Sequence, residues 1–341
     1  MIQLPQPAPD NQPPVPGAMH VVADGIRWLR LALPFRLDHV NVYMLDDGDG
    51  TTLVDTGIFD APTCTVWERL LPALAAEGRP VRRIIATHCH PDHLGMAGWI
   101  AERTGAPLLM SMSEYLTSLA IHLDPSALEA EPYATFYASH GLDPAVTARL
   151  LHNGHHYLRM VSPLPRTFGR VIAGEQLTIG ARRWQILTGG GHAPEQVMLH
   201  CPDDDLLLCA DQVLLRISPN ISVQAMDPEG DPLGIYLRSL ASLRALIPDT
   251  TLLLPGHNLP FRGLRARVDE LTAHHTGRLA AILEACRDRP TTAAALIPTV
   301  FGRTIDDPHQ MGFAFGEALA HANLLVRREQ LRLRAGRFEP V

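Results

Sequence analysis

The chain has 341 residues, of which 46% are hydrophobic and 19% are charged. This composition supplies a substantial core and excludes general disorder, and the length suits one large catalytic domain with an appendage. All 29 basic residues are arginine, and the net charge is -7 without a concentrated basic block. Bulk electrostatics therefore do not favour nucleic acid as a partner, although a local arginine groove stays open as an alternative.

The N-terminal segment and the cysteines indicate a cytoplasmic protein. Residues up to about Gly17 include six prolines and are typical of a tail with little structure of its own, without the pattern of a secretory signal. No apolar stretch approaches the about 20 residues needed to cross a bilayer, so no membrane contact is expected. The five cysteines form no CxxC pair. Cys201 and Cys209 could face each other across a hairpin, but we favour reduced, buried thiols.

From His20 onward, short β segments alternate with helical segments. The apolar patterns predict, in chain order, strands at Ile26–Leu33, Val40–Leu45 and Thr51–Val54, a helix at Pro62–Gly78 and a strand at Val81–Ala86. Residues 113–165 are richer in helical pattern and are expected to form an insertion. The pattern then predicts strands at Gln176–Ile179, Arg183–Thr188, Gln196–His200 and Leu206–Ala210, a helix at Asp231–Leu246 and a strand at Thr251–Leu254. This succession predicts a layered α/β architecture.

After Pro260 the strand signals stop. Apolar residues recur at helical spacing from Leu264 to Cys286, and two further helices are expected at Thr291–Val300 and Met311–Leu333. We therefore divide the chain into a tail (1–18), a catalytic domain (19–261) and a C-terminal helical domain (262–341). The C-terminal helices could shape a pocket or form the interface of a homodimer.

The most informative segment is Thr87–Gly95, with the sequence THCHPDHLG. It follows an apolar strand and places three histidines and an aspartate within six positions. Alternate residues of an extended chain point the same way, so His88 and His90 can converge on one point. Pro91 then bends the chain and lets Asp92 and His93 face a second point. Imidazole and carboxylate groups suit zinc, iron or manganese.

Three remote residues could complete such a site because each follows a predicted strand. His192 comes after a strand and three glycines, which would let the backbone approach a crowded centre. Asp211 follows Leu206–Ala210, and His257 follows Thr251–Leu254. Strand ends on one edge of a sheet can deliver all three to a shared metal centre.

The order HxHxDH, then Gly-His, Asp and Gly-His, resembles the metallo-β-lactamase superfamily, especially its glyoxalase II-like hydrolases. Asn41-Val42-Tyr43 and Leu53–Gly57 match that family's opening strands. The resemblance implies an αββα sandwich with His88, His90 and His192 on one metal ion. It places Asp92, His93 and His257 on a second ion, with Asp211 between the two. Asp55 would steady the ligand loop, or would simply be a turn residue before Gly57.

Two features depart from the common family pattern. The segment around His192 reads GGGHAPEQ, so Glu195 and Gln196 either line the site or cap the next segment. The second is the helical insertion. Its polar-aromatic residues and the loop after Asp211 are pocket candidates, although packing or surface positions are the simpler interpretation: Tyr133, Tyr137, His155, His156, Tyr157 and Ile217–Asn220.

The expected chemistry is hydrolysis by a metal-bridged hydroxide, oriented by Asp211 or Asp92, with two divalent ions, zinc by default. The first hypothesis for the substrate is a small-molecule thioester, ester or lactone. The basic residues that bind glutathione in glyoxalase II have no counterpart here, and a coenzyme A or other acyl thioester is compatible. One alternative is phosphodiester cleavage, with Arg262, Arg265 and Arg267 gripping phosphates. Another is persulfide oxidation at a single iron.

Overall fold

Two seven-stranded sheets lie face to face at the centre of the structure, a computed structural model that describes residues 6–7, 12–126, 131–153, 156–305 and 307–341. The first sheet has the order β2 (Met19–Ala23), β3 (Ile26–Ala32), β4 (His39–Asp46), β5 (Thr51–Val54), β6 (Val81–Ile85), β7 (Leu108–Met110) and β8 (Gly169–Arg170). The second has the order β1 (Gln6–Pro7), β14 (Phe261–Arg262), β13 (Leu252–Pro255), β12 (Leu206–Ala210), β11 (Gln196–Cys201), β10 (Arg182–Gly189) and β9 (Gln176–Ile179). Strands β5 to β8 run parallel, as do β12 and β13.

The strands are apolar on both faces because both faces are covered. Trp28 of β3 and Tyr43 of β4 share one buried cluster with Trp184 of β10 and Val197 of β11, and this cluster fills the space between the sheets. The intervening residues of the same strands point outward, since successive side chains alternate. Leu29, for example, packs against the helical layer outside the first sheet.

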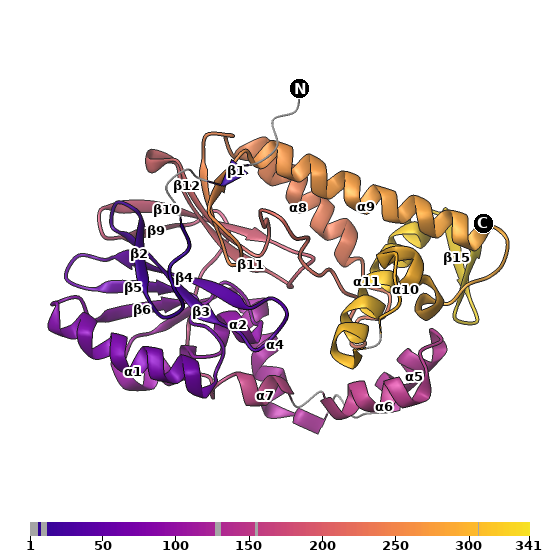
Figure 1. Ribbon diagram of the computed structural model, residues 1–341, viewed down its shortest axis with the longest axis horizontal. Helices are drawn as coiled ribbons and strands as arrows, with labels where there is room; N and C mark the ends of the chain where they lie inside the picture. The colour runs from indigo at the N-terminus through magenta and orange to yellow at the C-terminus, as the bar shows by residue number, and fades with distance from the viewer. Residues whose placement is uncertain (1–5, 8–11, 127–130, 154–155, 306) are drawn as a thin grey trace.

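Helices cover the outer face of each sheet (Figure 1). α1 (Ala61–Ala76) and α3 (Ala97–Thr104) pack on the first sheet, and α8 (Pro232–Leu246) and α9 (Leu264–Arg287) lie outside the second. Aspartates cap two of these helices: the Asp60 side chain accepts from the N–H of Thr63, and Asp231 accepts from the N–H of Gly234. The layers give the predicted αββα sandwich.

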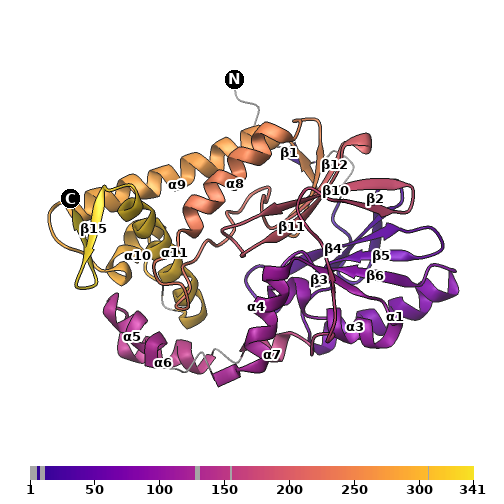
Figure 2. The same ribbon diagram turned by 180° about the vertical axis from the view of Figure 1, so that it is seen from behind.

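The predicted insertion is helical and connects two parts of the molecule. It contains α4 (Met112–Leu123), α5 (Glu131–Ser139), α6 (Pro144–Asn153) and α7 (His156–Met160). Phe136 and Leu142 belong to the core of the C-terminal helices, whereas Tyr157 and Met160 pack against the core outside the first sheet. The insertion therefore runs from the N-terminal half towards the C-terminal helices, as the reverse view also shows (Figure 2).

The C-terminal region is helical, as expected, but it ends in a β-hairpin. α10 (Ala293–Phe301) and α11 (Pro308–Arg327) are followed by β15 (Leu331–Arg334) and β16 (Arg337–Pro340). The helix predicted at Met311–Leu333 is therefore wrong beyond Arg327. The hairpin turn needs positive φ at Ala335 (48°) and Gly336 (73°), and the buried Phe338 anchors the second strand.

Three smaller expectations can also be compared with the structure. Gln6–Pro7 pairs with β14, so the proline-rich tail is not wholly without structure, although residues 1–5 and 8–11 lie outside the described part. All five cysteines are unbridged in the structure, and all but the half-buried Cys64 are buried. Among the described helices, none combines the length and the apolar character needed to span a bilayer.

Candidate metal centre

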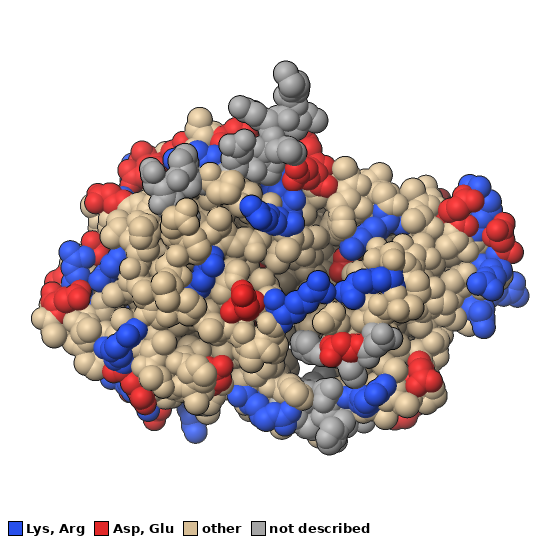
Figure 3. All heavy atoms as spheres, in the orientation of Figure 1, with Lys and Arg blue, Asp and Glu red and all other residues tan. Residues whose placement is uncertain are grey.

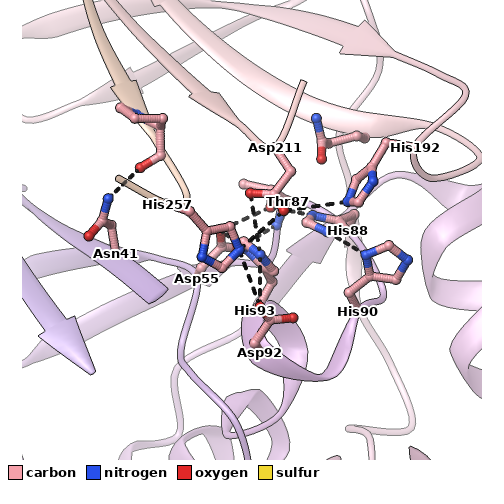
Figure 4. Close-up of polar contacts among 12 residues, drawn as sticks. Asn41, Asp55, Thr87, His88, His90, Asp92, His93, His192, Asp211 and His257 are labelled. Carbon is pink, nitrogen blue, oxygen red and sulfur yellow. Dashed lines mark hydrogen bonds and ion pairs between the residues drawn. The ribbon is translucent and has the colours of Figure 1, made fainter. Parts of the chain in front are cut away.

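The predicted ligand residues meet at one edge of the sandwich because each follows the end of a strand. The loop after β6 carries four of them, a short turn α2 (Pro91–Leu94) holds two of those four, and the ends of β10, β12 and β13 supply the others. Figure 4 shows the seven side chains converging from these segments: His88, His90, Asp92, His93, His192, Asp211 and His257.

Three histidines form a first group that could hold a metal ion: His88, His90 and His192. His88 Nε2 lies 3.0 Å from His90 Nδ1, and the ring of His192 stands 4.6 Å from that of His90 between centroids. Pro91 begins α2 directly after His90, so the chain turns away at this point. The bend separates the first group from the two ligand residues that follow.

A second group consists of Asp92, His93 and His257. Asp92 Oδ2 lies 3.3 Å from His257 Nε2 and 3.6 Å from His93 Nε2. His93 and His257 are buried, whereas the side chain of Asp92 is 20% exposed. The second group is thus open to solvent on the Asp92 side.

The carboxylate of Asp211 contacts both groups. One oxygen, Oδ2, lies 3.4 Å from His192 Nε2 and 3.2 Å from His257 Nε2, and the other, Oδ1, lies 3.6 Å from His93 Nε2. His93 Nε2, His192 Nε2 and Asp211 Oδ1 are buried without a hydrogen-bond partner within the described structure. Such atoms are costly unless something satisfies them, and a pair of cations between the groups would do so.

The outward nitrogens of four rings are fixed by neighbouring groups. Nδ1 of His88 lies 2.9 Å from Thr87 Oγ1, and Nδ1 of His93 lies 2.8 Å from Asp55 Oδ2. The other two rings contact backbone carbonyls. Nδ1 of His192 lies 2.8 Å from the Asn220 carbonyl, and Nδ1 of His257 lies 2.7 Å from the His39 carbonyl. These contacts orient each Nε2 towards the centre, which is how ligating histidines are commonly held.

Asp55 lies beside this centre and contacts the ligand loop directly. Besides its contact with His93, its carboxylate accepts from the N–H and the hydroxyl of Thr87, at 2.8 and 3.0 Å. Asp55 has a positive φ of 64°, which is uncommon for a residue other than glycine. The strained backbone aims the carboxylate at the ligand loop, so Asp55 does more than precede a turn.

The charges of the site are arranged to receive cations. Burial lowers the pKa of His88, and it lowers that of His90 to about 3, so both rings are neutral. Burial acts in the same direction on His257, but the carboxylates of Asp211 and Asp92 outweigh it and raise that pKa to about 10. Burial would raise the pKa of Asp211, but His257 and His93 hold it well below its ordinary value. Two anionic carboxylates therefore lie among the rings.

One glycine lies directly against this centre, but it is not one of the three that precede His192. The run before His192 was expected to approach the metals. Instead, a Cβ on Gly191 would lie 2.5 Å from that of Tyr236 on α8, so the run allows packing against this helix. The residue with the expected role is Gly256, where a Cβ would lie 2.3 Å from Asp211 Oδ1 and 2.8 Å from His93 Cε1. It precedes His257 and leaves room for both side chains.

Sequence reasoning missed two residues that hold the ligand loops. Asn41 donates through Nδ2 to the Pro255 carbonyl at 2.9 Å and so ties β4 to the His257 loop. Glu114 of α4 is buried and accepts from the N–H groups of Cys89 and Glu195. The match of Asn41 to the family's opening strands was a signal for the first. Glu114 lies in the insertion, where no motif marks it.

The pocket candidates have mixed outcomes. The Tyr157 hydroxyl donates to the Cys89 carbonyl at 2.7 Å, so Tyr157 supports the ligand loop. Tyr137 packs against the C-terminal core, and His155 lies outside the described residues. Asn220 supports His192 through its carbonyl, and Glu195 accepts from the Ser113 hydroxyl at 2.8 Å.

Outside this centre, the described residues contain one group with metal-ligand spacing, His275, Glu317 and His321. Arg278 pairs with Glu317, and the fixed guanidinium charge opposes a divalent ion at the same carboxylate. His275 Nδ1 lies 3.1 Å from His321 Nε2, and the other ring nitrogen of His321, Nδ1, contacts the backbone carbonyl of Glu317. We interpret this group as a buried polar network.

Comparison with known proteins assigns both parts of the chain. The family model described as "Metallo-beta-lactamase superfamily" matches residues 35–257, and that described as "Metallo-beta-lactamase-like, C-terminal domain" matches residues 279–340. The chain is similar to a β-lactamase domain protein from Burkholderia ambifaria, with 39% identity and a TM-score of 0.90 over 99% of this chain and 98% of that one.

Two further proteins resemble most of the chain. One is a metallo-β-lactamase family protein from Thermus thermophilus, with 28% identity and a TM-score of 0.78 over 94% of this chain and all (100%) of that one. The other is the "Probable metallo-hydrolase YqjP" of Bacillus subtilis (strain 168), which is 21% identical over 89% of this chain and 92% of its own length.

Proposed function

The chain belongs to the metallo-β-lactamase superfamily, and we propose that it is a binuclear metal-dependent hydrolase that cleaves a small-molecule ester, thioester or lactone. The observation that carries the proposal is the position of Asp211, whose oxygens lie within 3.6 Å of Nε2 atoms in both histidine groups. A carboxylate between two complete ligand groups favours two ions over one. The glyoxalase II-like branch remains our proposal on the ligand order.

Zinc is the proposed metal, because histidine and aspartate ligands suit it and hydrolysis needs no redox chemistry. His88, His90 and His192 would hold one ion, and Asp92, His93 and His257 the other, with Asp211 shared. Bound ions of this kind supply a water that is deprotonated near neutral pH and polarise the oxygen of the group under attack.

The chain's own residues would orient this reaction. Asp92 is the partly exposed carboxylate of the centre, so it can accept a hydrogen bond from a nucleophilic water that enters from the open side. Asp211 and the held rings fix the geometry around it. Cys89 lies between ligands but supplies no thiolate, because burial raises the pKa of its thiol well above the ordinary value.

Small molecules are favoured over nucleic acid because two of the three arginines considered for phosphate binding are bonded to the protein's own backbone, whereas Arg265 is exposed. Arg267 is buried and donates to the carbonyls of Leu214 and Ile217, at 2.7 and 2.9 Å, and Arg262 donates to the carbonyl of Thr250. Both guanidinium groups therefore donate hydrogen bonds to backbone carbonyls of the protein itself. On the face shown in Figure 3, basic and acidic side chains are interspersed, and the surface is hollowed near its middle.

A substrate panel tests the proposal. The protein as purified and the protein loaded with zinc are each assayed with acyl thioesters, simple esters, lactones, phosphodiesters and a persulfide, and the Asp211→Ala variant is assayed beside them. We expect turnover of at least one of the first three classes, and loss of both turnover and bound metal in the variant while its circular dichroism stays that of the wild type. Full activity in Asp211→Ala, or turnover of the persulfide alone with one iron per chain, would overturn the proposal.

A further inference from the structure

The buried carboxylate of Glu114 lies between the two loops that carry the first histidine group. Glu114 belongs to the first turn of α4, and its side chain has no exposed surface (0%). Oε2 accepts from the N–H of Cys89 at 2.9 Å, and Oε1 accepts from the N–H of Glu195 at 2.7 Å. Cys89 separates His88 from His90, and Glu195 follows His192 by three positions. One side chain is therefore bonded to both loops.

Packing alone does not account for a carboxylate here. Burial of a charged group without compensation is strongly unfavourable, and an apolar side chain would fill the same space at no such cost. Burial raises the pKa of Glu114, and the two backbone N–H groups act against that rise. Hydrogen bonds from N–H groups to an ionised acceptor are among the stronger ones in proteins. They fix the positions of the donors as well as that of the acceptor.

Neighbouring groups bind the same loops, but each reaches only one of them. Ser111 donates through Oγ to the Glu195 carbonyl at 2.9 Å, and Ser113 donates through Oγ to the Glu195 carboxylate at 2.8 Å. Tyr157 contacts only the Cys89 loop. Within the described structure, Glu114 is the side chain whose hydrogen bonds join the two loops, beside one backbone bond from the Val197 N–H to the Thr87 carbonyl at 2.8 Å. Its loss would let the loops move relative to each other.

We propose that Glu114 is a positioning residue for the first metal ion, holding the His88–His90 loop in register with the His192 loop. The inference rests on the proposed two-metal centre and adds a site-specific consequence to it. Loss of the bridge should weaken the ion held by His88, His90 and His192. The ion held by Asp92, His93 and His257 should be little affected, because the hydrogen bonds of the Glu114 carboxylate go to the loops of the first group, at Cys89 and Glu195.

The test measures zinc affinity by competition with a chromophoric chelator in Glu114→Gln, which keeps the shape but turns a donor towards one of the two N–H groups. We expect one of the two ions to bind about 10- to 100-fold more weakly, the range typical of lost supporting contacts around a metal. Ser113→Ala on the same helix is the matched control. It removes a contact of the Glu195 side chain, leaves both backbone bonds to Glu114, and should bind both ions as the wild type does.

Combination with ligand variants identifies the affected ion. In a His257→Ala background only the first group is complete, and Glu114→Gln should weaken the remaining ion by the same 10- to 100-fold. In a His192→Ala background it should change the remaining affinity by no more than about twofold, the limit expected for independent sites. Glu114→Asp keeps the charge but is shorter by one methylene, and its zinc affinity should lie between that of Glu114→Gln and that of the wild type.

The outcomes separate the two proposals. A wild-type protein that binds fewer than two ions contradicts the proposed function, whatever the variants do. Unchanged affinities in Glu114→Gln, or equal weakening of both ions, overturn the role of Glu114 alone. If neither Glu114 variant folds without metal, as judged by thermal unfolding, Glu114 is a folding determinant and the inference is wrong.

Discussion

Replacing Gly256 with alanine would place a methyl group inside the candidate metal centre. Its Cβ would lie 2.3 Å from Asp211 Oδ1, more than an ångström short of the 3.4 Å at which ordinary contact begins, and 2.8 Å from His93 Cε1. The backbone cannot easily move away. The Gly256 N–H donates to the Ala210 carbonyl at 2.9 Å, and its carbonyl accepts from the Asn41 N–H at 2.7 Å. The side chains of the centre must therefore shift.

The size of the effect follows from this displacement. A misplacement of about 1 Å at a reacting centre can lower catalysis by about 100-fold, or about 2.7 kcal/mol of transition-state stabilisation. Overpacking in a well-packed site also lowers the free energy of unfolding by about 1–3 kcal/mol. We therefore expect Gly256→Ala to lose about 100-fold in kcat/KM and to bind metal more weakly, while it still folds.

Gly277→Ala is the matched control. Gly277 lies on the exposed side of α9, and a Cβ there meets nothing within 4 Å. Alanine in a helix interior is favoured over glycine by about 0.5–1 kcal/mol, so this variant should be slightly more stable and fully active. Both variants are compared by kcat/KM, metal content and urea unfolding. Wild-type activity and metal content in Gly256→Ala would refute the arrangement of Asp211 and His93 described above.

Asp55→Asn removes the carboxylate that accepts from His93 Nδ1 and Thr87, and metal affinity should fall by about 10- to 100-fold in chelator competition; an unchanged affinity would deny Asp55 a supporting role. A second prediction concerns acid stability without metal. Burial lowers the pKa of His275 to about 2 and that of His321 to about 4. Below pH 6.5 these two histidines therefore bind protons in the unfolded chain but not in the folded chain. Stability should therefore fall by about 3 kcal/mol from pH 7.5 to 5.5 through both residues. His275→Leu should lose about half of that dependence in urea unfolding; an unchanged slope would show that His275 titrates normally.

The clustering of the candidate ligand residues could be predicted because their pattern is local. HxHxDH after an apolar strand fixes four candidates, and the remaining three each follow a strand whose β character is plain in the sequence. Strand ends that share an edge then bring distant residues together, as with Asp211 and His257 on the neighbouring parallel strands β12 and β13.

The supporting residues could not be predicted in the same way. Glu114 is one polar residue in a helix, and its partners are backbone N–H groups, which leave no mark in the sequence. The roles of the glycines depend on what packs beside them: Gly191 meets α8, whereas Gly256 meets the centre. The final hairpin was missed because Leu331 and Leu333 continue the apolar spacing of α11 past its end at Arg327.

The most direct test of the two-metal account is the metal content per chain of freshly purified protein, measured by plasma mass spectrometry together with hydrolysis of the active substrate as metal is removed and restored. The account predicts about two divalent ions per chain, and hydrolysis that is lost with them and returns when zinc is restored. One ion per chain at full activity would contradict it, and the place of the Asp92, His93 and His257 group in the centre would then have to be abandoned.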